Sequence, residues 1–193
     1  MLLTEPVTLE NKYVRLEPLS PEHAADLSVA AVGLERAWYT SVPRPGAVTQ
    51  DIAQRLAWRD AGHMNPFVIR TLDTGAVVGE TTFCNIDQPN RHVEIGHTWL
   101  SLSAQGTVVN PAAKLLLLAH AFETCDAIAV EFRTHWHNRQ SRAAIERLGA
   151  KLDGVLRNHR IGPDGSLRDT VVYSVLPPEW PAVRLGLEAR LDA

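Results

Sequence analysis

The chain has 193 residues, of which 45% are hydrophobic, and a formal net charge of −3. This length and composition predict one globular domain, residues 1–193, with a sizeable core. The slightly acidic charge balance argues against a nucleic-acid partner, which normally requires a basic surface. No run of about 18 apolar residues could span a bilayer, and the N-terminus lacks the basic and apolar regions of a secretion signal. We therefore expect a soluble cytoplasmic protein without a membrane partner.

The two cysteines, Cys84 and Cys125, are predicted to be buried free thiols, as is typical of proteins in a reducing compartment. Together with the eight histidines they do not fall at metal-ligand spacings. We expect no metal site.

The first half of the chain carries strand and helix signals without a linker. Residues 14–19 alternate as a strand, and Ser20 with Pro21 begins a helix that ends near Val32. The Pro- and Gly-containing segment 39–47 is typical of a loop over a site. The other elements predicted here are a helix over 49–61 and antiparallel strands over 67–72, 77–83 and 92–102.

The second half alternates helices and strands. The predicted order is helix 111–123, strand 127–135, helix 138–148, strand 151–157, strand 170–176 and a last helix from Glu179. The first crossover should place strand 127–135 parallel to strand 92–102, which makes the sheet mixed and the fold class α/β. Ligands of such sheets bind at the carboxyl ends of central strands.

One of those ends leads into segment 105–114, Gln-Gly-Thr-Val-Val-Asn-Pro-Ala-Ala-Lys. Asn110 is predicted to cap the following helix and Pro111 to lie in its first turn, which leaves the amides of Ala112 and Ala113 free at the positive end of the helix dipole. A strand, a short loop of small residues and a helix N-terminus are typical of an anion site. The alternative is a structural cap that binds nothing.

The second informative segment is 138–149, Asn-Arg-Gln-Ser-Arg-Ala-Ala-Ile-Glu-Arg-Leu-Gly. At helical spacing Asn138, Ser141, Ile145 and Leu148 share one face, so two polar groups begin an otherwise apolar stripe. The alternative interpretation makes Asn138 a plain N-cap and Gly149 a left-handed C-terminal residue.

Together these segments resemble the GCN5-related N-acetyltransferase (GNAT) superfamily, in particular its RimJ/RimL-type branch. The resemblance covers nearly the whole chain, because it also includes segments 15–19, 77–80, 94–100, 154–157 and 164–174 in the same order. It implies the GNAT fold, with a mixed, mostly antiparallel central sheet, a splayed parallel pair and helices on both faces. It also implies binding of acetyl-coenzyme A and direct transfer of its acyl group to an amine.

The family's use of these segments implies a set of cofactor-binding residues. Its loop amides cradle the pyrophosphate, and the pantetheine arm extends beside the strand ahead of the loop. Asn138 matches an asparagine that contacts the cofactor, and Ser141 matches a serine near its sulfur. The implied residues are Thr98, Trp99, Leu100, Leu102, Gln105, Gly106, Thr107, Val108, Val109, Asn110, Asn138 and Ser141.

The chemistry of thioester aminolysis gives these residue types their roles. Attack by a neutral amine generates an oxyanion, which a backbone N–H at Trp99 or Leu100 could stabilise. A thiol has a pKa of about 8.5, so a hydrogen bond from Ser141 could assist the leaving thiolate. The amine arrives mostly protonated and needs a base, for which Glu94 is the first candidate. Glu94 could equally be an ordinary solvated or paired strand residue.

The acceptor side is less specified. Trp38, His97 and His135 are candidates to line its pocket, with the two histidines as alternative bases; for tryptophans, core packing is the common alternative. Protein N-termini, amino acids and other small amines all remain open as acceptors. So do monomer and homodimer.

Three positions depart from the family pattern. Val108 replaces the second glycine of the loop, Ala112 replaces a glutamate, and Ile145 replaces a tyrosine that many members use as general acid. Valine does not adopt positive φ cheaply, so the loop can cradle an anion only if Val108 stays in the β or α region. These departures keep open a catalytically silent acyl-CoA sensor or interaction module on the same fold.

Other possibilities are weaker. A nucleotide-binding protein lacks support, since neither Gly-x-x-x-x-Gly-Lys-Ser/Thr nor Gly-x-Gly-x-x-Gly is present. Arg139, Arg142 and Lys114 could meet a phosphate, but solvent-facing or ion-paired positions are more typical of such side chains.

Overall fold

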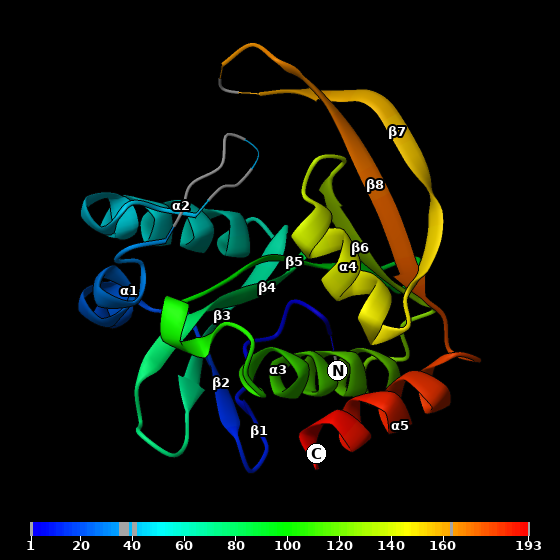
Figure 1. The fold of residues 1–193 in the computed structure, drawn as a ribbon, viewed down its shortest axis with the longest axis horizontal. Coiled ribbons are helices and arrows are strands. Elements are labelled where there is room, and N and C mark those ends of the chain that lie inside the picture. Colours follow the sequence, from blue (N-terminus) through cyan, green and yellow to red (C-terminus); the bar gives the residue numbers. More distant parts are fainter. Residues whose placement is uncertain (1, 35–38, 40–41, 163, 193) are drawn as a thin grey trace.

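The computed structural model describes residues 2–34, 39, 42–162 and 164–192. Its centre is a sheet of eight strands (Figure 1). The strands are β1 (Leu9–Glu10), β2 (Val14–Pro18), β3 (Met64–Thr71), β4 (Val77–Asp87), β5 (His92–Leu100), β6 (Ala129–His135), β7 (Lys151–Ile161) and β8 (Leu167–Val175). Their order across the sheet is β1-β2-β3-β4-β5-β6-β8-β7.

Neighbouring strands in this order run antiparallel, and β5 and β6 form the parallel pair that the crossover predicts. The predicted fold class, a mixed and mostly antiparallel sheet with one parallel pair, is therefore confirmed. Each predicted strand has a counterpart: β3, β4, β7 and β8 are longer than predicted, whereas β5 and β6 are two residues shorter than the strands expected over 92–102 and 127–135.

Helices cover both faces of the sheet. They are α1 (Ala24–Ala30), α2 (Val48–Asp60), α3 (Val109–Ala119), which continues as a π-helical turn over His120–Thr124, α4 (Arg139–Leu148) and α5 (Trp180–Leu191). The helix expected over 20–32 is a 3₁₀ turn, Pro21–His23, followed by α1; further 3₁₀ turns lie at Pro45–Ala47 and Leu102–Ala104. In Figure 1, α3 and α5 lie side by side, away from α1 and α2.

Strand β3 shows how the two faces divide the core. Val68 packs in the cluster under α1 and α2, with Leu27, Ile52 and Trp99. Its neighbours Phe67 and Ile69 point to the opposite face, because successive strand side chains alternate, and pack in the cluster that holds α3 and α5. The run is apolar throughout because both faces are covered.

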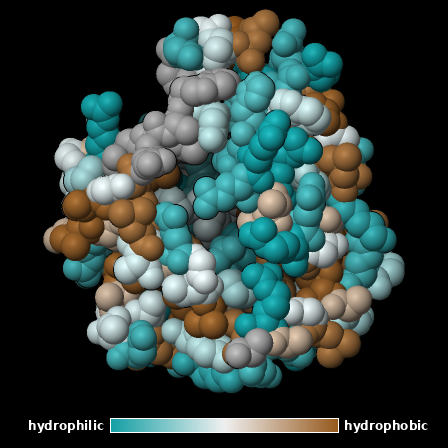
Figure 2. All heavy atoms as spheres, in the orientation of Figure 1, coloured by the Kyte–Doolittle hydropathy of each residue, from teal (hydrophilic) through white to brown (hydrophobic). Residues whose placement is uncertain are grey.

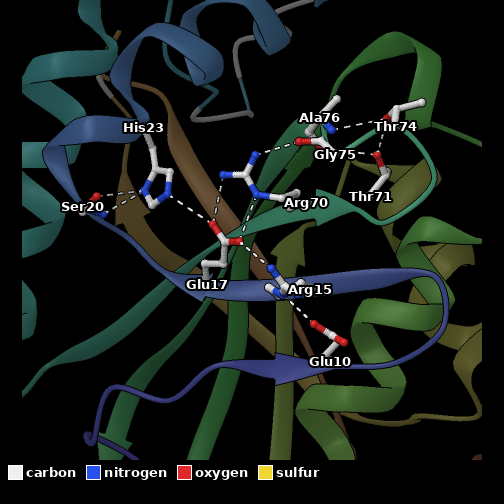
Figure 3. Close-up of polar contacts among 10 residues, drawn as sticks. All are labelled: Glu10, Arg15, Glu17, Ser20, His23, Arg70, Thr71, Thr74, Gly75 and Ala76. Atoms are coloured by element: carbon white, nitrogen blue, oxygen red, sulfur yellow. Dashed lines mark hydrogen bonds and ion pairs between the residues drawn. The ribbon is translucent and has the colours of Figure 1, made fainter.

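A polar cluster joins β2, β3 and the turn before α1 (Figure 3). The carboxylate of Glu17 accepts two hydrogen bonds from the Arg70 guanidinium, at 2.9 and 3.1 Å. His23 lies 3.4 Å from the same carboxylate, and Arg15 lies 3.8 Å from it. The bonds from Arg70 lower the pKa of Glu17. This bidentate ion pair links β2 to β3.

Two further expectations can be compared with the structure. Cys84 and Cys125 are both buried and unpaired with each other, as predicted. Among the helices that the structure describes, none is long and apolar enough to cross a membrane.

Candidate active site

The parallel strands β5 and β6 separate part of the way along their length. Their register runs from His92↔Ala129 to Glu94↔Glu131 and ends there, whereas β5 continues to Leu100 and β6 to His135. Two cavities adjoin the point of separation, one of about 590 Å³ and one of about 270 Å³. Both are lined by His97 and Arg133, so the two spaces meet at these side chains.

A bulge in β5 accounts for the separation. Glu80 of β4 pairs with Trp99 and Thr82 pairs with Gly96, so two residues of β5, at positions 97 and 98, face one residue of β4. His97 has a positive φ of 50°, a backbone conformation that few residues other than glycine adopt. A bulge bends and twists its strand, and here it turns the second half of β5 away from β6.

The larger cavity lies between β5, α3, β6 and α4. Figure 2 shows this face of the molecule hollowed near its centre, with hydrophilic residues gathered beside the hollow. Eight of the twelve predicted cofactor-binding residues line the cavity: Thr98, Trp99, Leu100, Leu102, Gln105, Asn110, Asn138 and Ser141. Gly106, Thr107, Val108 and Val109 are not among its lining residues. They form the turn that leads into α3.

The start of α3 corrects the predicted cap. The helix begins at Val109 with Val108 in the cap position, two residues earlier than the predicted cap at Asn110. The amide of Ala112 is not free, since it donates to the Val108 carbonyl at 2.9 Å. Of the other amides in the first turn, that of Val109 donates to the Thr107 hydroxyl, and Pro111 has none, so the remaining one is that of Asn110.

The conformation of this loop explains why a valine is tolerated in it. Val108 has φ −67° and ψ −13°, in the α region. The left-handed position belongs to Gly106, with φ 72°. Thr107 closes the turn, because its hydroxyl accepts from the Val109 amide at 3.3 Å and donates to the Ala104 carbonyl at 2.8 Å. The turn therefore does not require the second glycine of the family pattern.

Helix α4 begins and ends as the sequence predicts. The side-chain oxygen of Asn138 accepts from the Ser141 amide at 3.0 Å, and Gly149 ends the helix with φ 96°. The cap uses only the oxygen of the Asn138 amide and does not need its NH₂ group. Asn138 and Ser141 also line the larger cavity, so the cap and a ligand-binding role are compatible.

Lys114 is a functional candidate that the sequence analysis placed wrongly. It is 5% exposed and lines the larger cavity, rather than facing water or a carboxylate. Its Nζ donates to the hydroxyls of Thr98, at 2.8 Å, and Thr81, at 3.3 Å, and these hydroxyls are 2.8 Å apart. Within the described ranges no carboxylate lies within 4.0 Å of it. Burial lowers its pKa to about 7.

Lys114 thus bridges the two strands at the bulge. Thr98 is one of the two extra residues of β5, and Thr81 is the residue of β4 that faces them. The sequence held one signal of this burial. Lys114 stands between two alanines and a run of four leucines, which leaves its part of the helix without a polar face.

The smaller cavity is built around Glu94, which is 7% exposed. Its carboxylate accepts from the Asn85 amide at 2.6 Å and lies 3.7 Å from Arg133. Burial raises the pKa of Glu94, and the contacts with Asn85 and Arg133 oppose this rise only in part. A buried carboxylate with a raised pKa is a suitable proton acceptor near neutral pH.

His97 stands at the junction of the two cavities. Part of its surface remains exposed, yet desolvation of the ring, followed by the positive charge of Arg55, lowers its pKa to about 4. The ring is therefore neutral at pH 7 and can accept a hydrogen bond or a proton. The sequence analysis proposed His97 for the acceptor side, and it does line both spaces.

Of the other two acceptor-side candidates, the structure describes only His135. Trp38 lies outside the described residues. His135 is 3% exposed at the end of β6, with its ring centre 5.6 Å from that of Tyr39 and 5.5 Å from that of His137. It lines neither of the two cavities.

A second buried polar group supports the bulge from the α2 side. Trp99 donates its indole N–H to Glu80 at 2.8 Å, and Arg55 lies 3.5 Å from the same carboxylate oxygen. Arg55 is 2% exposed and also donates to Asp51 at 2.5 Å. Sequence reasoning missed this group, since its members come from α2, β4 and β5 and meet only in the folded chain.

Comparison with known proteins shows which family has this fold. The family model described as acetyltransferase (GNAT) domain matches residues 14–151. YdaF of Bacillus subtilis, whose name gives ribosomal N-acetyltransferase as a provisional activity, is 29% identical over 167 residues, which are 86% of this chain and 90% of that protein.

Solved structures of acetyltransferases have the same fold. A GCN5-related N-acetyltransferase from Brucella melitensis superposes with a TM-score of 0.86 at 28% identity, over 97% of this chain and 86% of that one. RimJ of Mycobacterium smegmatis, solved in complex with CoA-disulfide, superposes with a TM-score of 0.80 at 25% identity, over 98% of both chains. The chain belongs to the GNAT family and is an acetyltransferase.

Proposed function

We propose that this chain transfers an acetyl group from acetyl-CoA directly to a primary amine. The observation that carries the proposal is the meeting of two cavities at His97 and Arg133, with Ser141 in the larger and Glu94 in the smaller. A donor and an acceptor that enter from the two sides would meet at the separation of β5 and β6.

The larger cavity suits the donor. Its volume is about 590 Å³, and residues of β5, α3, α4 and the loop before α3 line it. The bulged half of β5 offers backbone groups that β6 no longer uses, to which the amides of a pantetheine arm can bond. The amide of Asn110, a residue that lines this cavity, lies at the positive end of the α3 dipole, which suits the pyrophosphate.

The smaller cavity suits the amine. The Glu94 carboxylate takes a proton from the incoming ammonium, directly or through a water molecule. The neutral nitrogen then attacks the thioester carbonyl carbon, and the backbone N–H of Trp99 or Leu100 stabilises the oxyanion.

Collapse of this tetrahedral species breaks the carbon–sulfur bond. The second proton of the nitrogen passes to the departing sulfur, with a hydrogen bond from the Ser141 hydroxyl stabilising the thiolate. The products are the N-acetyl amine and free CoA, and one proton remains on Glu94 for release to solvent. No covalent enzyme intermediate is needed, and the two cysteines are poor nucleophiles, because burial raises the pKa of the Cys125 thiol and of the Cys84 thiol.

The test combines donor binding with acceptor turnover. Calorimetry should show micromolar binding of acetyl-CoA, and an acceptor screen with acetyl-, propionyl- and succinyl-CoA should release free thiol. Because the name of YdaF points to ribosomal proteins, the screen should include protein N-termini beside amino acids and small amines. No binding of any acyl-CoA would overturn the proposal at its base. Binding without thiol release would instead favour a silent acyl-CoA sensor.

A further inference from the structure

The hairpin of β7 and β8 places two arginines opposite each other near its tip. Arg160 and Arg168 are direct partners in the antiparallel register. Side chains at such positions stand with their Cβ atoms about 4.5–5.5 Å apart on one face, where two like charges repel. A pair of this kind is destabilising unless something of opposite charge lies near it.

Among the described residues no carboxylate is in contact with the pair, and the nearest compensating charge is that of Glu94, which acts on both arginines across the smaller cavity. Neither Arg160 nor Arg168 has a carboxylate within 4.0 Å in the part of the chain that the structure describes. The Nε of Arg168 is buried and has no hydrogen-bond partner there. Burial, and then the charge of Arg160, lowers the pKa of Arg168. The same hairpin shows the contrasting case, since Arg157 is paired with Asp169 at 2.6 Å.

One arginine of the pair lines the acceptor side of the site. Arg160 lines the smaller cavity together with Glu94, His97 and Arg133. The charges of Arg160 and Arg168 also contribute to the low pKa of His97, which places them within electrostatic reach of the junction. Arg133 does not add an uncompensated charge, because Glu131 lies 2.7 Å from it.

The chemistry of two neighbouring arginines suits a carboxylate. Two guanidinium groups side by side present several N–H donors to one planar anion, and such charge-assisted bonds are among the strongest in proteins. In Figure 1 the β7–β8 hairpin extends well beyond the end of α4 and bends toward the side of the molecule on which α2 lies.

We propose that Arg160 and Arg168 form an anion subsite of the acceptor pocket, which makes the preferred acceptor a primary amine that carries a carboxylate a few bonds away. The carboxylate lies against the two guanidinium groups while the amine lies at Glu94. The inference rests on the proposed acetyl transfer and narrows its acceptor. A free amino acid and a peptide with an acidic residue near its N-terminus share this chemistry.

The experiment compares acceptors that differ in one charge. In the first arm, thiol release from acetyl-CoA is measured with alanine and alaninamide. In the second, a peptide amide with aspartate as its second residue is compared with its asparagine counterpart. The amine of alaninamide is less basic than that of alanine, so a larger fraction of it is unprotonated near neutral pH. This difference alone would favour alaninamide, so a preference for alanine cannot come from amine basicity.

Three variants complete the design: Arg160→Gln, Arg168→Gln and, as a matched control on the same hairpin, Arg157→Gln. The wild type should prefer the carboxylate-bearing acceptor in at least one arm. The first two variants should lower the ratio of kcat/KM for that acceptor to kcat/KM for the uncharged one by about tenfold or more, as expected for a lost charge-assisted bond. The control should keep the wild-type preference.

Each adverse outcome has a distinct meaning. Equal use of charged and uncharged acceptors in both arms would overturn the subsite and leave acetyl transfer intact. So would a control variant that loses as much preference as the other two. Absence of thiol release with every acceptor would overturn the proposed transfer, and the subsite with it.

Discussion

Replacing Lys114 with methionine should make the protein more stable at neutral pH. The native lysine has a pKa of about 7 because burial removes its charge from water, whereas an unfolded lysine has the ordinary value of 10.5. This difference, at about 1.36 kcal/mol per pH unit, corresponds to roughly 5 kcal/mol of cost for the charged form. Methionine fills the same space without a charge, and Thr81 and Thr98 remain bonded to each other at 2.8 Å.

The pH dependence of the effect follows from the same values. Between pH 7 and pH 10.5 the unfolded chain binds more protons at this site than the native protein, so wild-type stability rises with pH in this window. The advantage of Lys114→Met should therefore shrink by roughly 3 kcal/mol between pH 7 and pH 10. Other groups titrate equally in both proteins and cancel in the difference.

Urea unfolding of the two proteins at several pH values measures this directly. Lys12→Met serves as the control, because Lys12 is an exposed side chain, 66% accessible and paired with Asp192. A stability difference for Lys114→Met that stays constant within about 0.5 kcal/mol over the window would refute the reasoning, since it would mean that the amine is hydrated in the native state. A functional reason for keeping this lysine would appear as a loss of kcat/KM in the stabilised variant.

Four further outcomes are expected. Glu94→Gln should lower kcat by about a hundredfold with the acetyl-CoA Kd unchanged in calorimetry, and a fall in affinity of similar size would place Glu94 in binding instead. Ser141→Ala should slow turnover by about tenfold while CoA affinity stays nearly intact, as single-turnover and binding measurements can separate. Gly79→Ala should destabilise the fold by more than about 2 kcal/mol in thermal unfolding, because its Cβ would lie 2.1 Å from the carbonyl oxygen of Trp99; a melting temperature like that of the wild type would contradict this contact. Glu17 has a lowered pKa in the folded protein, so the stabilisation by its carboxylate is present above the unfolded pKa and is lost as pH falls through the folded pKa. The free energy of unfolding of Glu17→Gln should therefore be lower than that of the wild type by about 1–3 kcal/mol at pH 7, and the difference should disappear in acid.

Local signals in the sequence were sufficient for much of the fold. The cap at Asn138 and the left-handed Gly149 act within one or two turns of their own helix, and both were predicted at the correct residues. The parallel pair followed from a crossover of ordinary length. The cap at Asn110 was wrong because Thr107 stabilises an earlier start, and both starts place proline within the first turn.

The site was harder to predict, for a physical reason. The bulge at His97 places a non-glycine residue at positive φ, and no sequence pattern predicts such a conformation. Lys114 and Glu94 look like ordinary charged residues until the fold buries them. Their altered pKa values come mainly from burial, so they appear only once the tertiary packing is known.

The two side chains shared by the cavities make donor and acceptor thermodynamically dependent on each other. A molecule that contacts His97 or Arg133 from one side changes the environment that the other molecule meets. Linkage requires the change to be mutual: the factor by which a bound acceptor alters the dissociation constant of the donor is the factor by which the donor alters that of the acceptor. Substitutions at either residue should therefore change the affinities for donor and acceptor together, whichever of them binds first.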